Sequence, residues 1–76
     1  MADAETLREL VTDVFRGEER DDVLEFIKNG EPEEAEHCLL VELAELYRER
    51  AVQFRDLVRY CLRLGISVAQ VVPNSE

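Results

Sequence analysis

The sequence predicts an all-α protein, a small helical bundle that occupies residues 1–76 as one domain. Glycine and proline are scarce, with three and two copies in 76 residues, and leucine, glutamate and arginine are abundant. Apolar residues recur with helical spacing along most of the chain. This length allows one domain with a small core. We expect two short N-terminal helices packed on one long helix, and a short apolar C-terminal tail over residues 66–76.

The first helix is expected over residues 4–16. Asp3 can cap its first turn, because a carboxylate accepts a hydrogen bond from the free backbone N–H groups of a helix start. Gly17 is expected to end the helix as a C-cap. The helix has one apolar stripe with i, i+3, i+4 spacing, made of Leu7, Leu10, Val11, Val14 and Phe15.

The second helix is expected over residues 20–29. Asn29 and Gly30 both tolerate the left-handed conformation, so the pair predicts a stop. Pro32 then suits the first position of the next helix, where its fixed φ is favourable. The apolar face of this second helix comprises Val23, Leu24, Phe26 and Ile27.

The third and longest helix is expected over residues 32–64. No glycine or proline interrupts this segment between Pro32 and Leu64. Its apolar residues stay on one side of a helical wheel, which we call the apolar arc. One continuous helix would be about 50 Å long at ~1.5 Å per residue. The alternative is two helices with a break near residues 48–51.

The apolar side of such a helix predicts a homodimer. The two N-terminal helices, at about 20 and 15 Å, are too short to cover a ~50 Å helix, and symmetric dimers are the commonest closed assembly. Arg50 lies inside the apolar arc. Either the helix breaks there, or the side chain extends to the edge of the apolar arc, or the arginine is buried and pairs with a carboxylate across an interface. The residues expected to mediate self-association are Leu40, Tyr47, Arg50, Phe54 and Val58.

The charge is strongly negative and uneven. The net charge is −9, and residues 1–37 hold 13 acidic and 4 basic residues. This argues against direct nucleic-acid binding, which needs a basic surface. The acidic residues form a solvated surface, or they imitate the phosphates of a nucleic acid and occupy a basic groove on another protein. The expected acidic surface includes Glu18, Glu19, Asp21, Asp22 and Glu25.

Four arginines form the only basic stripe on the predicted long helix: Arg48, Arg55, Arg59 and Arg63. One interpretation is a solvated face that pairs with acidic residues of the first two helices. The other is a docking strip for an acidic partner.

No catalytic constellation is evident, so we expect no enzymatic activity, no cofactor and no metal. Glu34 and His37 form an E-x-x-H unit, the spacing found in di-iron helical bundles, but they fall outside the apolar arc. His37 is the only histidine. Cys38 and Cys61 match no metal or redox spacing and are expected to be free thiols.

The segment Leu64-Gly65-Ile66-Ser67 resembles the turn of helix-turn-helix domains such as those of resolvases. The resemblance implies that Gly65 ends one helix and that Ser67 caps a second, DNA-reading helix. Pro73, however, stands where that helix should continue, and no basic residue follows Arg63. The segment is better explained as an apolar tail that packs on the chain's own core or on a second subunit.

These features favour a small, non-enzymatic regulatory or adaptor protein that acts through helix-mediated protein contacts, as a homodimer. The alternative is an acidic inhibitor that mimics nucleic acid. A DNA-binding fragment or a metal-binding helical protein is less favoured. Since no signal peptide or membrane span is visible, a cytoplasmic location is expected.

Overall fold

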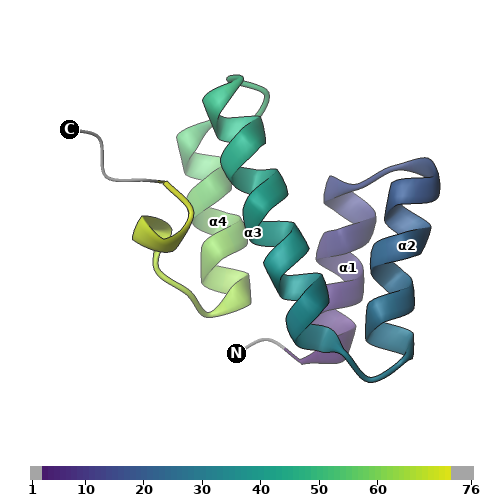
Figure 1. Ribbon diagram of the computed structural model, residues 1–76. Helices are drawn as coiled ribbons and strands as arrows, with labels where there is room; N and C mark the ends of the chain where they lie inside the picture. The colour runs from purple at the N-terminus through teal and green to yellow at the C-terminus, as the bar shows by residue number, and fades with distance from the viewer. Residues whose placement is uncertain (1–2, 73–76) are drawn as a thin grey trace.

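The computed structural model describes residues 3–72, which form four α-helices and a short 3-10 turn. Figure 1 shows α1 and α2 lying side by side, α3 crossing them diagonally, and α4 on the far side of α3. The prediction of an all-α bundle is therefore confirmed. The helices are α1 (Ala4–Val14), α2 (Gly17–Lys28), α3 (Pro32–Arg48) and α4 (Phe54–Leu64), and the 3-10 turn is η1 (Val68–Gln70).

Helix α1 begins as predicted but ends earlier. The Thr6 backbone N–H donates to Asp3 Oδ1 at 2.9 Å, and this hydrogen bond lowers the pKa of the Asp3 carboxyl. The prediction that Gly17 caps the end of α1 is wrong. Phe15 and Arg16 are extended, and Gly17, with φ +61°, begins α2 instead. The early end places Phe15 in the core, where it is buried.

The end of α2 follows the prediction. Gly30 adopts φ +80°, its N–H donates to the Ile27 carbonyl, and the Glu31 N–H donates to the Phe26 carbonyl at 2.8 Å. This pair of hydrogen bonds is a Schellman motif. Pro32 is the first residue of α3, as expected.

The preferred prediction of one continuous helix over 32–64 is wrong, and the alternative break near 48–51 is confirmed. Helix α3 ends at Arg48, and α4 begins at Phe54. A second Schellman motif closes α3, because the Ala51 N–H donates to the Leu46 carbonyl at 2.7 Å and the Arg50 N–H to the Tyr47 carbonyl at 3.0 Å. Arg50 occupies the left-handed position with φ +62°, which glycine usually takes.

Packing explains why the chain turns at a residue that disfavours the turn. A left-handed conformation costs a non-glycine residue about 1–2 kcal/mol. Burial of one leucine side chain contributes about 1.5–3 kcal/mol, so burial of several leucines outweighs the cost of the turn. The reversal places α4 beside α3 and α1. The side chains of α3 and α4 with no exposed surface are Ala35, Leu39, Leu43, Leu57, Cys61 and Leu64.

The core receives residues from every helix and from the tail. Gly65, with φ +75°, ends α4, and Ser67 caps η1 with a capping box to Gln70. Val71 is buried against the chain's own core, with 4% exposed, so the tail packs on its own subunit through this residue. Residues 73–76 of the predicted tail, which include Pro73, lie outside the described residues. The other core residues are Leu7, Leu10, Val11 and Phe15 of the α1 segment and Val23 and Ile27 of α2.

We predict that Arg50→Gly stabilises the protein. Glycine removes the Cβ penalty at φ +62°, and its greater freedom in the unfolded chain offsets part of the gain. The free energy of unfolding should rise by about 0.5–1 kcal/mol in urea denaturation.

Gly30→Ala is the matched control, because Gly30 has a positive φ and no atom within 4 Å of an added Cβ. An alanine there meets only backbone strain, so the free energy of unfolding should fall by about 1 kcal/mol. A destabilised Arg50→Gly protein would contradict the backbone explanation of this turn.

Candidate protein-binding surfaces

The break at residues 49–53 changes which of the predicted self-association residues are buried within the chain and which are exposed. Residues 32–64 do not form one long helix with an uncovered apolar side, because α4 folds back beside α3 while α1 and α2 pack along α3. Leu40, Tyr47 and Val58 are half-buried within the chain, and Phe54 is 53% exposed. Arg50 is exposed, so within one chain its place in the apolar pattern is explained by its role in the turn. The part that these residues play in self-association stays a prediction.

An aromatic pair joins the two helices beside this turn. The ring centroids of Tyr47 and Phe54 lie 6.0 Å apart, with an angle of 57° between the ring planes. Such tilted pairs contribute about 0.5–1.5 kcal/mol beyond their buried area. Phe54 therefore has two roles, since one part of its ring packs on Tyr47 and the rest faces solvent.

The outer face of α4 is amphipathic and basic. Arg55, Val58, Arg59 and Leu62 have i, i+3, i+4, i+7 spacing, so they share one side of the helix. Val58 is half-buried, both arginines are exposed, and Leu62 is 73% exposed. We call these four residues the α4 outer face.

The predicted four-arginine stripe is interrupted. Arg48 belongs to α3, on the other side of the turn from the three arginines of α4. Arg63 donates from Nη2 to Glu9 Oε1 of α1 at 2.6 Å. This ion pair supports the interpretation that the arginines pair with acidic residues of the N-terminal helices. Within residues 3–72, Arg55 and Arg59 form no ion pair.

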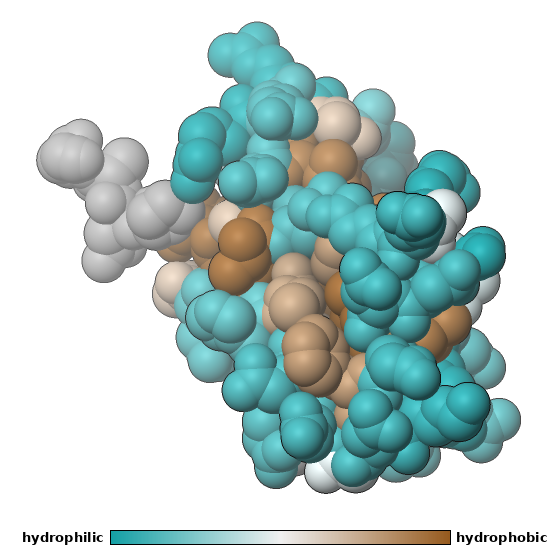
Figure 2. Space-filling model, turned by 45° about the vertical axis from the view of Figure 1, so that its right-hand side comes forward, coloured by the Kyte–Doolittle hydropathy of each residue, from teal (hydrophilic) through white to brown (hydrophobic). Residues whose placement is uncertain are grey.

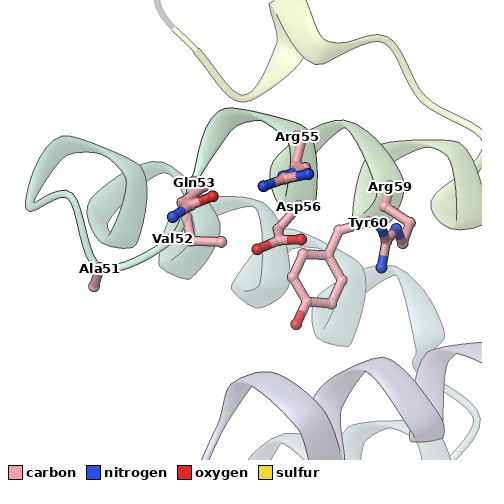
Figure 3. A pocket seen from close by; sticks show the side chains of 7 residues that line it. All are labelled: Ala51, Val52, Gln53, Arg55, Asp56, Arg59 and Tyr60. Atoms are coloured by element: carbon pink, nitrogen blue, oxygen red, sulfur yellow. The ribbon is translucent and has the colours of Figure 1, made fainter.

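A shallow depression lies beside the start of α4. Figure 3 shows Asp56 and Tyr60 on the side of α4 that faces α1, where Asp13 lines an adjoining depression. Arg59 stands at the edge of the α4 outer face, and its side chain turns toward this depression. The charges here are mixed, because Asp56 accompanies the arginines. The lining residues in Figure 3 are Ala51, Val52, Gln53, Arg55, Asp56, Arg59 and Tyr60.

A second surface, which sequence reasoning missed, is a groove between α2 and α3. Figure 2 brings the α2 side of the molecule forward and shows apolar surface as a strip between hydrophilic side chains. Val41 is 48% exposed and falls outside the apolar arc of α3, which is the one signal visible in the sequence. We call this surface the α2–α3 groove. Its apolar residues are Phe15, Val23, Phe26, Cys38 and Val41, and its polar residues are Glu19, Asp22, His37 and Glu42.

The predicted acidic surface divides into two faces of α2. Glu18, Asp21 and Glu25 share one side of the helix by i, i+3, i+7 spacing, and Arg20 contacts Asp21 at 3.4 Å. Glu19 and Asp22 instead line the α2–α3 groove. All five carboxylates are exposed.

Burial and neighbouring carboxylates raise the pKa values of two side chains in the groove, Glu42 and Cys38. The pKa of Glu42 is raised, mainly by burial and then by the charges of Glu19, Glu45 and Glu49. Burial also raises the pKa of the Cys38 thiol, with smaller effects from Glu34 and Glu19. The groove therefore disfavours further negative charge and would be relieved by a cation.

The two cysteines are free thiols in unreactive settings. Burial raises the pKa of Cys61 in the core, which opposes formation of the nucleophilic thiolate. His37 is exposed on α3. The described part of the chain brings no three His, Cys, Asp or Glu residues into an arrangement that could hold a metal ion.

Comparisons with protein-family models, with curated proteins and with solved structures find no match to this chain. No helix within residues 3–72 combines the length and apolar character that crossing a membrane requires. After Gly65, the segment that resembles a helix-turn-helix forms the three-residue turn η1 where a DNA-reading helix would begin.

We predict that Glu42→Gln stabilises the protein at neutral pH. A raised pKa in the folded state means that the charged carboxylate opposes folding above that pKa. Since the side chain stays partly exposed, the gain should be about 0.5 kcal/mol at pH 7. The gain should disappear as the pH falls through the raised pKa of Glu42, because the wild-type carboxyl is then protonated.

Thermal unfolding measured from pH 7 to pH 4 tests this prediction. Glu33→Gln is the matched control, because Glu33 is exposed in the first turn of α3, where a negative charge is favourable. Its effect at pH 7 should have the opposite sign. A loss of stability in Glu42→Gln at pH 7 would contradict the predicted effect of burial.

Proposed function

We propose that this protein is a small, non-enzymatic adaptor or regulatory protein that acts through helix-mediated protein contacts and self-associates. The observation that carries the proposal is the α4 outer face, where Leu62 is 73% exposed about one turn after Arg59. A scattered apolar residue on a surface needs no explanation. An exposed leucine at helical spacing with a second apolar residue and two arginines is the pattern of an amphipathic helix that binds in a groove.

The energetics support a recognition role for this face. Leu62 contributes little to the fold, because most of its side chain stays in water. Its burial against a partner would contribute about 1.5–3 kcal/mol, whereas an exposed ion pair contributes under about 1 kcal/mol. Leu62 would supply affinity and the arginines would select the partner, as charged rims commonly do.

An acidic mimic of nucleic acid is the second candidate. It is favoured by the exposed carboxylates on the side of α2 away from the groove: Glu18, Asp21 and Glu25. A partner of this kind would be a DNA-binding protein, and competing duplex DNA would release it from the immobilised chain. A partner held through Leu62 would stay bound in that experiment.

We predict concentration-dependent self-association that depends on Leu62. Sedimentation equilibrium at about 0.15 M salt, where charge repulsion between chains is screened, should show species larger than the monomer at high-micromolar concentrations. Leu62→Gln should weaken the association by about tenfold or more, since it removes most of the apolar burial.

The matched control is Ala4→Gln, which places the same side chain at an exposed position of α1. It should leave the association unchanged. Both variants should unfold like the wild type, because neither position is in the core. A monomer throughout the concentration series would contradict self-association.

A further inference from the structure

The two candidate surfaces have complementary shape and charge. The α2–α3 groove has apolar residues along its floor, with carboxylates from both helices beside them. The α4 outer face has apolar residues with arginines beside them. One surface is concave and acidic, and the other is a helix face that is convex and basic.

The charges of the helices make this match selective. Helix α4 carries three arginines against one acidic residue, and it is the only one of the four helices with an excess of positive charge. Helix α2 carries five acidic residues against two basic ones, and α3 carries five against one. In a chain with net charge −9, α4 is therefore the segment that an acidic groove attracts most strongly.

Symmetric pairing of like surfaces is disfavoured by the same charges. Two α4 outer faces in contact would bring arginines against arginines. Two α2–α3 grooves in contact would bring Glu19, Asp22 and Glu42 against the same carboxylates. Like charges placed opposite each other across an interface cost several kcal/mol.

We propose that the α2–α3 groove of one copy binds the α4 outer face of a second copy. Val58 and Leu62 of the incoming helix lie over the apolar floor near Val41, and Arg55 and Arg59 lie beside Glu19 and Asp22. This inference rests on the proposed self-association and specifies its geometry.

The structure of one chain supports an intermolecular contact. Figure 1 places α4 on the opposite side of α3 from α2, so a chain's own α4 does not reach its own groove. Glu42 gains from a nearby guanidinium, because burial and neighbouring carboxylates already oppose its charge. Arg63 is left out of the contact, since it is bonded to Glu9.

The contact joins two different surfaces and is therefore head-to-tail. Each copy keeps one free groove and one free α4 outer face unless a ring closes. One helix face in one shallow groove belongs to the small interfaces, below about 1,200 Å², that form transient complexes. The expected association is therefore dynamic.

Charge reversal on each surface tests the proposal by sedimentation equilibrium. Glu19→Lys with Asp22→Lys alters the groove, and Arg55→Glu with Arg59→Glu alters the α4 outer face. In each double variant the dissociation constant of self-association should rise by about tenfold or more. All four positions are exposed, so circular dichroism should show folded proteins. The control Glu18→Lys with Asp21→Lys makes the same charge change on the other side of α2 and should associate at least as well as the wild type.

The four-residue swap variant gives the decisive result. It combines both double variants, keeps the net charge at −9, and should regain association to within about threefold of the wild type, since its groove is basic and its α4 face is acidic. The control for the swap combines Arg55→Glu and Arg59→Glu with Glu18→Lys and Asp21→Lys. It should not regain association, because its lysines lie away from the groove.

The outcomes separate this inference from the proposed self-association. A wild-type chain that stays monomeric overturns both. The groove contact is overturned if either double variant still associates, or if the swap variant does not regain association. Self-association would then use another surface, or the groove would bind a basic helix of another protein.

Discussion

The reversal of the chain at Arg50 is the constraint on which the rest of the structure depends. A Schellman motif ends α3 there, with a non-glycine residue in the left-handed conformation. Because the turn sends α4 back along α3, the leucines of both helices share one core with α1. Without this turn, α4 would extend beyond the reach of the N-terminal helices, and Leu57 and Leu64 would lose their cover.

The turn also determines which residues remain available for recognition. It buries the inner side of α4 and leaves Leu62 and two arginines on its outer side. It separates Arg48 from the arginines of α4, and it brings Arg63 of α4 within ion-pair distance of Glu9 of α1. The four-arginine stripe predicted along one long helix is therefore reduced to a short basic face on α4, on one side of the bundle.

Hydrophobic burial and charge have separate roles in this molecule. The core is apolar, and within residues 3–72 no charged or polar residue is buried. The two ion pairs that are present lie at the surface, with side chains at least 41% exposed, so they contribute little to stability. The uneven charge therefore contributes mainly to the choice of partner, with acidic groups at the α2–α3 groove and basic groups on α4.

The sequence by itself determined the class of the fold, most residues of the core and the helix ends that local signals mark. Asp3, Asn29-Gly30 and Pro32 act through backbone chemistry within one or two turns, so their effects can be predicted from neighbours in the chain. The turn at Arg50 could not be predicted with the same ease. The two helices of a hairpin direct their apolar sides toward a shared core, so the helical period continues through a turn that neither glycine nor proline marks.

The candidate surfaces depend still more on tertiary structure. The sequence identified the arginines of α4 and the carboxylates of α2, because their charges are visible in any conformation. Only the tertiary structure decided that Glu19 and Asp22 face a groove while Glu18 and Asp21 face away, and that Val41 stays exposed. A groove belongs to two helices at once, and their spacing is determined by the core beneath them rather than by the order of residues in either helix.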